Sequence, residues 1–520
     1  MGELSSIFSY TLVANLSVFL FGGISLKKII IMLFSVLTLF VSCGKDNRQI
    51  LRVGMEVGYA PFNWFQNTSD NGAVKISSGY ANGYDVQIAK LIAKELNMKL
   101  EIVPSDWDSL LGPAVNSNKI DLVIAGMSPT SERRKSLDFT NSYYESDIVV
   151  VVKKNSKYSN AKTLNDFMGA RITGQLNTIH YNLIDQLKGV VKKTSMENFP
   201  SMVVALNSDK IDGYIAEKPS ALSAEFSDSS ITHVEIHKNG FKYNSDEVNV
   251  AIGLKKGNIE LKDRVNKALS KIDKDTRDNL MRDAIKNQPL GETPKSKNFV
   301  EWVYEIISKY WTKYLMGTVI TLFLASFGTV VGGIIGMVVA FVNESQGNKI
   351  LKGINYIYIL IFRGTPMIVQ SMIFYYGLGQ LLGINLNPLV AAMVIIFVNT
   401  GAYISEIFRG AIASIDKGQY EAAKTLGFNH RQIMQYIIMP QSFRNALPAI
   451  GNEFIVNIKD SSVLFAIGVT ELYTVSKQIA GTNFRYYEVF IITCAIYFVL
   501  TTVFSKLVSI LEKRLDRIEG

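Results

Sequence analysis

The chain has 520 residues, 48% of them hydrophobic, and a formal net charge of +9. That length exceeds what a single hydrophobic core usually serves, so at least two domains are expected. The basic residues form no stripe interleaved with aromatic residues, which argues against nucleic acid as a partner. The two cysteines and four histidines make no Cys/His cluster and no disulfide framework, so we predict no metal site and no cofactor. The sequence contains neither GxxxxGKS nor GxxxxGKT and therefore brings no such phosphate-binding loop of its own.

Residues 1–43 are predicted to be a leader. In KKIIIMLFSVLTLFVSC (27–43) a lysine pair precedes an apolar core of about 13 residues, which is shorter than the roughly 20 that a membrane span needs. The end of this stretch resembles a bacterial lipobox, although Phe40 departs from the usual first residue. That resemblance implies lipidation of Cys43, and an uncleaved signal anchor is the alternative. Residues 1–25 lack a basic region, so a start of translation at Leu26 is a hypothesis.

Residues 47–290 alternate strand-like and helical stretches, which predicts an α/β domain with largely parallel sheets. The stretches most informative about family are GYAPFNW (58–64), GYDVQIAKLIAKEL (83–96), DWDSL (106–110), KIDLVIAGMSPTSERRKSLDFTNSYY (119–144) and KIDGYIAEKPSA (210–221). They resemble the extracellular solute-binding proteins for polar amino acids, of the family 3 type. The resemblance implies a two-lobed, periplasmic-binding-protein-like fold of type II with the ligand in the cleft. Lobe one is expected at about 50–145 plus 250–290, with lobe two between them.

A free amino acid has a carboxylate, which needs a fixed bidentate donor, and Arg133 can supply one. The run from Ser128 to Glu132 is predicted to start a helix, with Ser128 or Thr130 as its cap. The amide N–H groups of such a helix start would face the same carboxylate. Gly126 would let the backbone come close to the ligand.

The family resemblance adds further contacts. It implies that Glu217 pairs with the ammonium group, that Thr178 contacts the carboxylate, and that Tyr59 and Trp107 enclose the side chain. Glu56 would face the end of that side chain. A carboxylate there favours Arg, Lys and His, accepts Gln second, and disfavours acidic and branched apolar side chains. Ordinary structural roles are the alternatives: a solvated Arg133, packed aromatic residues, Glu217 in a turn, and Glu56 turned to solvent.

Residues 314–512 are predicted to be an all-α transmembrane domain of five helices, which a polar linker at 291–313 joins to the first domain. Four glycines between 328 and 336 give the first span a face for close helix packing. Pro366 predicts a kink in the second span. The charged residues of the fourth span either pair near its end or line a translocation path; they are Glu453, Lys459 and Asp460. The spans are expected near 314–343, 355–382, 388–404, 446–469 and 489–505.

A polar segment, EAAKTLGFNHRQIMQYIIMP (421–440), separates the third and fourth spans. Composition alone allows a helix that lies on the membrane surface or a knob that a soluble partner grips. Its spacing resembles the cytoplasmic coupling motif of ATP-binding-cassette (ABC) importer permeases, with Met439 where that family usually has Leu. Basic residues flank the spans on the same side, in agreement with the positive-inside rule. The resemblance implies that an ATPase contacts Glu421, Ala422, Ala423, Gly427 and Pro440.

Together these resemblances imply a fused receptor and permease of an ATP-driven importer in a bacterial cell membrane, with the binding domain outside and the coupling segment and C-terminus in the cytoplasm. The expected partners are a polar amino acid, membrane lipid, a second copy of the chain and two copies of a separate ABC ATPase. The chain itself is not expected to be an enzyme. A ligand-gated channel should carry a filter loop between the lobes, and a membrane sensor should end in a kinase or coiled-coil domain. Neither is visible, and the choice of amino acid stays open.

Overall fold

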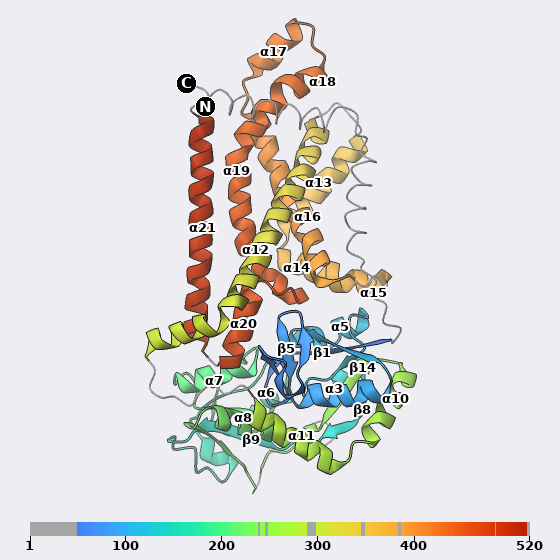
Figure 1. The fold of residues 1–520 in the computed structure, drawn as a ribbon, viewed down its shortest axis with the longest axis vertical. Coiled ribbons are helices and arrows are strands. Elements are labelled where there is room, and N and C mark those ends of the chain that lie inside the picture. The colour runs from blue at the N-terminus through green and yellow to red at the C-terminus, as the bar shows by residue number, and fades with distance from the viewer. Residues whose placement is uncertain are drawn as a thin grey trace.

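In the computed structural model, the residues described are 49–237, 240–244, 248–288, 298–344, 349–382, 386–483 and 485–516. Two α/β lobes lie at one end of the molecule, and a bundle of helices extends from them (Figure 1). The leader and Cys43 fall outside the described residues, so their processing and lipidation remain predictions.

Lobe one is built on a five-stranded sheet with the order β6-β1-β7-β14-β8. Its two parallel ladders join β1 to β6 and β7, and its two antiparallel ladders join β14 to β7 and β8. A four-stranded sheet, β2-β3-β5-β4, completes the lobe. The strands are β1 (Ile50–Met55), β2 (Gly58–Tyr59), β3 (Asn63–Gln66), β4 (Val74–Ile76), β5 (Gly79–Asn82), β6 (Lys99–Pro104), β7 (Leu122–Val123), β8 (Leu137–Tyr144) and β14 (Val250–Lys255). The helices are α3 (Tyr84–Glu95), α4 (Trp107–Leu110), α5 (Pro113–Asn116), α10 (Ile259–Ser270) and α11 (Lys274–Asn287).

Lobe two repeats that plan with the order β11-β10-β12-β9-β13. Again two parallel ladders are followed by two antiparallel ones, and the four-stranded sheet of lobe one is antiparallel throughout. The prediction of largely parallel sheets is therefore wrong, since seven of the eleven ladders between the described strands are antiparallel. In the five-stranded sheets the cause is the two crossings between the lobes. β9 follows the first crossing and runs antiparallel to β12, and β14 follows the second and runs antiparallel to β7. The strands are β9 (Ile148–Lys153), β10 (Arg171–Thr173), β11 (Val191–Lys192), β12 (Gly213–Glu217) and β13 (Ile231–Val234). The helices are α6 (Ile179–Leu183), α7 (Phe199–Asn207) and α8 (Lys218–Ser227).

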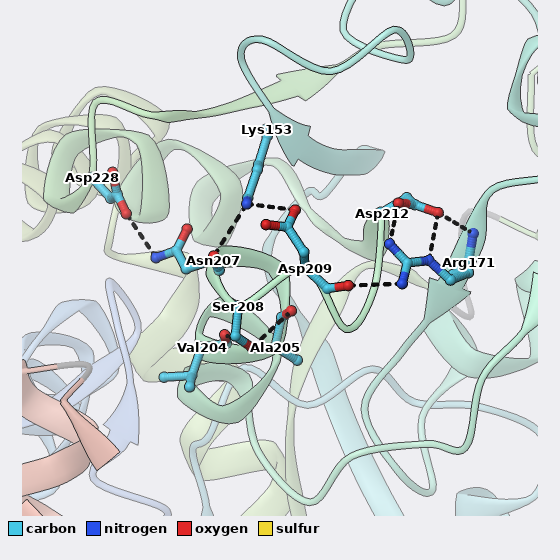
Figure 2. Close-up of polar contacts among 9 residues, drawn as sticks. All are labelled: Lys153, Arg171, Val204, Ala205, Asn207, Ser208, Asp209, Asp212 and Asp228. Atoms are coloured by element: carbon cyan, nitrogen blue, oxygen red, sulfur yellow. Dashed lines mark hydrogen bonds and ion pairs between the residues drawn. The ribbon is translucent and has the colours of Figure 1, made fainter. Parts of the chain in front are cut away.

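Each lobe also contains its own copy of the same turn, which fixes two parallel strands of its sheet to each other. In lobe two, Arg171 donates hydrogen bonds to both carboxylate oxygens of Asp212 and to the carbonyl of Asp209 (Figure 2). In lobe one, Arg52 makes the same set of bonds with Asp121 and the carbonyl of Asn118. Asn118 and Asp209 both have a φ of 56°, in the left-handed region that Asn and Asp tolerate. The sequences NSNKID (116–121) and NSDKID (207–212) therefore encode one structural repeat.

Three helices of the bundle are long and apolar enough to cross a membrane, namely α12, α16 and α21, within the part of the chain that is described. A fourth span is formed if α13 and the segment from Met367 to Leu382, which meet at a bend of 112°, count as one. The predicted kink lies in this break, since Pro366 immediately precedes α14. Five spans are not confirmed, because the predicted fourth span falls on α19 and a 3-10 segment that follows it. The helices are α12 (Phe299–Glu344), α13 (Lys349–Gly364), α14 (Met367–Met372), α15 (Leu378–Leu382), α16 (Pro388–Ala413), α17 (Lys417–Thr425), α18 (His430–Ile433), α19 (Met439–Asp460), α20 (Leu472–Asn483) and α21 (Tyr486–Asp516).

The glycine face predicted for the first span is confirmed where α12 crosses α16. A Cβ atom on Gly336 would lie 2.8 Å from the carbonyl oxygen of Gly401, and one on Gly332 would lie 2.9 Å from the Cβ of Thr400. Such distances leave no room for a side chain, so the two backbones approach closely. Gly333 does not take part, since a Cβ there would have its nearest neighbour at 3.9 Å.

The linker predicted at 291–313 is shorter in the structure, because α12 already begins at Phe299. The first turns of α12 bury Trp302, Ile306 and Tyr310, the last two in a cluster with α20 and α21. At the other end of the bundle, α17 and α18 lie far from the lobes (Figure 1). The helix α20 lies next to the lobes.

Candidate functional site

Arg133 occupies the cleft between the lobes and is only 8% exposed. Its guanidinium donates one hydrogen bond of 2.8 Å to the carbonyl of Ser128 and another of 2.8 Å to the carbonyl of Asn177 in lobe two. The group also lies over the ring of Trp107, 5.0 Å from its centroid. Burial lowers the pKa of Arg133 to about 10, although Glu217 and other anionic groups oppose the shift, so the group stays cationic at neutral pH. A buried, fixed guanidinium at this place is suited to hold a carboxylate.

The helix predicted to start at Ser128 is absent, and that prediction is wrong. Only a short 3-10 turn follows, from Arg133 to Lys135. The hydroxyl of Ser128 donates to the carbonyl of Val248, 3.0 Å away, instead of capping a helix. The amide of Arg133 is 3.4 Å from the hydroxyl oxygen of Thr130, a weak turn contact. An anion at this edge of the cleft would therefore be held by the Arg133 side chain rather than by a helix terminus.

Glu217 ends β12 and is 1% exposed. The hydroxyl of Tyr59, from lobe one, donates a hydrogen bond to its carboxylate. Burial raises the pKa of Tyr59 well above its usual value, and the Glu217 carboxylate raises it further, so Tyr59 stays a neutral donor. The Nε2 atom of His180 lies 3.4 Å from the other carboxylate oxygen. Glu217 thus contacts a residue of the opposite lobe and places a buried carboxylate where an ammonium group could pair with it.

His180 lies next to the candidate site, and the sequence did not suggest it. It lies in the first turn of α6, two positions after Thr178, and is buried. A histidine in a short amphipathic stretch gives no signal of its own. Only the fold brings it to Glu217.

Gly126 lies beneath the Tyr59 ring with a φ of 60°. A Cβ atom there would lie 2.7 Å from Cε1 of Tyr59, so both the backbone conformation and the available space require glycine. Tyr59 stacks on Phe62 at 5.3 Å and meets the edge of Phe199 at 5.7 Å. Tyr59 and Trp107 both face the cleft region, and their enclosure of a ligand side chain stays a prediction.

The loop 175–178 of lobe two is held in a defined shape. The hydroxyl of Thr178 donates to the carbonyl of Gln175 at 2.7 Å. Asn177 has a φ of 57°, in the left-handed region that Asn tolerates. Its side-chain amide also donates to Asp108 of lobe one at 2.8 Å. The carbonyl of Asn177 is consequently presented to Arg133.

Glu56 lies on a pocket formed between the lobes and α20. Burial raises the pKa of Glu56 to about 8, and the Lys477 ammonium partly opposes this shift. Glu56 therefore titrates close to neutral pH. The pocket also takes in Asp106, Lys477 and Tyr486, so residues of the bundle line the region that the sequence assigned to the ligand side chain.

The coupling segment forms a compact knob. Ala423 is buried against Ile433, whereas Glu421 and Ala422 are exposed. α17 ends before Gly427, whose φ of 87° places it in the left-handed region. A capping box between Asn429 and Gln432 starts α18, and Pro440 lies in the first turn of α19. The apolar side chain of Leu426 is 77% exposed beside the turn, so the knob presents an apolar tip.

A metal site is not apparent, since no group of three His, Cys, Asp or Glu side chains that could hold an ion occurs among the described residues.

Two family models match the chain. Residues 51–286 match the bacterial extracellular solute-binding proteins, family 3. Residues 332–517 match the binding-protein-dependent transport system inner membrane component.

Curated relatives match the permease half. The probable amino-acid permease protein YxeN of Bacillus subtilis is 35% identical over 222 residues, which are 42% of this chain and 98% of the relative. The glutamine transport system permease protein GlnP of Escherichia coli K12 is 36% identical over 200 residues, covering 38% of this chain and 91% of the relative. The arginine transport system permease protein ArtQ of B. subtilis is 37% identical over 201 residues, covering 39% and 91%.

Proposed function

We propose a transport mechanism for this chain, which belongs to the family of binding-protein-dependent amino-acid permeases and carries a family 3 solute-binding domain ahead of its permease domain. The cleft captures a polar amino acid outside the cell, and the helical domain passes it through the membrane. The observation that carries this proposal is the pair of buried, opposite charges, Arg133 and Glu217, on facing lobes. Their chemistry matches the carboxylate and ammonium groups that all free amino acids share.

A separate ABC ATPase is proposed to drive the transport by gripping the knob formed by α17 and α18. The exposed Glu421 and Leu426 give that knob a charged and an apolar contact. The knob and the binding lobes lie at opposite ends of the molecule, as transport across a membrane would require (Figure 1). A homodimer with two ATPase copies would complete the importer, because so few spans per chain do not easily enclose a path.

The substrate is proposed to be Arg, Lys or His first and Gln second. Glu56 carries this ranking, because an ionised carboxylate attracts a cationic side chain. The raised pKa of Glu56 gives a specific reason to keep glutamine as the second candidate. A protonated carboxyl can donate to the amide oxygen of Gln, whereas a cation must first displace the proton.

A ligand screen tests the proposal. The full chain in lipid nanodiscs is heated with each of the twenty amino acids in turn, and its unfolding temperature is recorded. A ligand at 100 times its Kd stabilises the folded protein by about 2.7 kcal/mol, enough for a shift of a few degrees. One or a few polar amino acids should raise the unfolding temperature. A screen in which none does would overturn the receptor function.

An amino-acid-gated channel remains the competing function, because it uses the same binding fold. Uptake into proteoliposomes separates the two. An importer needs its ATPase and ATP to accumulate the amino acid, whereas a channel would pass ions when the amino acid alone is added.

A further inference from the structure

The helix α20 lies across the boundary between the two lobes (Figure 1). Lys477, near its middle, contacts both of them. Its ammonium group lies 3.0 Å from the carboxylate of Asp106 in lobe one and donates a hydrogen bond to Glu197 in lobe two. One cation of the helical domain thus joins two carboxylates that belong to different lobes.

Both carboxylates stand at the edges of the ligand cleft. Asp106 precedes Trp107, the residue whose ring lies under the Arg133 guanidinium. Glu197 precedes Asn198, the cap of α7, and Asn198 accepts a hydrogen bond of 3.1 Å from the hydroxyl of Tyr486. The two acidic residues therefore stand on opposite sides of the boundary between the lobes.

The two carboxylates keep the ammonium group of Lys477 positively charged. Burial alone would lower the pKa of Lys477, but Asp106 and Glu197 outweigh burial, so its pKa lies above the usual value. Without the ammonium, the two carboxylates would repel each other.

The contacts of lobe one with the bundle include several that do not involve lobe two. The hydroxyls of Ser77 and Thr470 are 3.0 Å apart, and Lys313 donates to the carbonyl of Ser78. Lys119 donates to the carbonyl of Leu386 at 3.2 Å. These contacts attach lobe one to the bundle, and none of them would be broken by a movement of lobe two.

We propose that Lys477 senses closure of the cleft: it engages Asp106 and Glu197 together only when the lobes are shut, and so links docking on the bundle to the closed, substrate-holding receptor. This inference rests on the proposed function. By linkage, the same bridge strengthens substrate binding in the docked protein as much as substrate strengthens the bridge.

The test measures lobe separation directly. Spin labels are placed at the exposed positions Lys94 in lobe one and Lys188 in lobe two, in a full chain whose own cysteines are replaced (C43A, C494S), in nanodiscs. Pulsed electron–electron double resonance then gives the distribution of distances between the two labels. Lys477→Gln should move the distribution toward longer distances without any added amino acid, and Lys477→Arg should restore most of the short-distance population.

Substrate affinity is the second readout, with L-arginine and L-glutamine as the probes in calorimetry. Glu197→Gln and Lys477→Gln should each weaken binding about three- to tenfold, and the double variant should lose no more than either one, because both remove the same bridge. Lys210→Gln is the matched control. Lys210 is an exposed lysine of lobe two, and it corresponds in the NSDKID repeat to Lys119 of lobe one. It should change neither readout.

The failures of the two proposals are distinguishable. If neither probe nor any other amino acid binds, the receptor function is overturned, while the lobe distances still test the bridge. If an amino acid binds but the distance distributions of the wild type and Lys477→Gln coincide, closure sensing by Lys477 is overturned and the receptor function stands.

Discussion

Arg133 in lobe one donates a 2.8 Å hydrogen bond to the backbone carbonyl of Asn177 in lobe two, so the residue predicted to bind the carboxylate also touches the opposite wall of the cleft. The left-handed backbone at Asn177 points that carbonyl at the guanidinium. A ligand carboxylate bound by Arg133 would thus lie where both lobes meet.

Arg133→Ala should abolish amino-acid binding and leave the protein folded. Removing one partner of a buried, hydrogen-bonded charge pair costs about 2–5 kcal/mol, or roughly 30- to several-thousand-fold in affinity. Calorimetry on the full chain measures the loss. The control is Arg134→Ala, at the neighbouring exposed position, which should bind like the wild type. Unchanged affinity of the Arg133 variant would remove this residue from the site.

The binding of a cationic amino acid should depend on pH through Glu56. An acid with a raised pKa holds its proton more tightly in the folded protein, so its contribution to stability is complete below pH 4.5 and declines as the pH rises to about 8. A cationic ligand favours the ionised form and must release that proton. Its affinity should therefore rise with pH, by up to about tenfold per unit, and level off above pH 8.

Calorimetry in buffers of different ionisation enthalpy would detect the released proton. L-glutamine carries no side-chain charge and can accept a hydrogen bond from the protonated carboxyl, so its affinity should not rise over the same range. Glu56→Gln should flatten the L-arginine profile. An unchanged slope in that variant would mean that another group releases the proton.

Changes in the coupling knob should uncouple transport without affecting amino-acid binding. Glu421→Lys reverses an exposed charge, and Gly427→Trp forces a bulky residue into a left-handed turn. Both should reduce substrate-stimulated ATP hydrolysis and uptake by the complex with its ATPase, with an unchanged Kd. Glu260→Lys, a charge reversal at an exposed position of lobe one, is the control and should transport normally. Normal uptake by both knob variants would exclude the coupling role.

The packing of α12 against α16 gives a prediction about stability. Gly336→Ala places a methyl group 2.8 Å from the Gly401 carbonyl and should destabilise the helical domain by about 1–3 kcal/mol through overpacking. Gly333→Ala, three residues earlier and without a close neighbour, should leave stability unchanged or slightly raised. Thermal unfolding in detergent compares the two. Equal unfolding temperatures would mean that the helices can separate without cost.

Local sequence patterns predicted much of the fold. The α/β alternation and the break at Pro366 depend on residues close together in the chain, and the structure confirms them. The Arg52 and Arg171 turns could also have been found, because NSNKID and NSDKID are visibly similar.

The errors arose where tertiary contacts compete with local preference. Ser128 has a good capping side chain, but its carbonyl accepts from Arg133 and its hydroxyl donates to Val248, so no helix starts there. The linker is shortened because Ile306 and Tyr310 find buried places against α20 and α21. The contact of Lys477 with Asp106 joins residues 371 positions apart, and no local pattern announces it.

The short connection between α11, which ends at Asn287, and α12, which begins at Phe299, limits how the receptor can behave. Even fully extended, that stretch reaches only about 40 Å. The receptor therefore remains at an effective concentration on the order of millimolar over its own permease. Docking contacts too weak to hold a free protein suffice here, and a soluble binding protein added in trans at micromolar levels should compete poorly for the same surface.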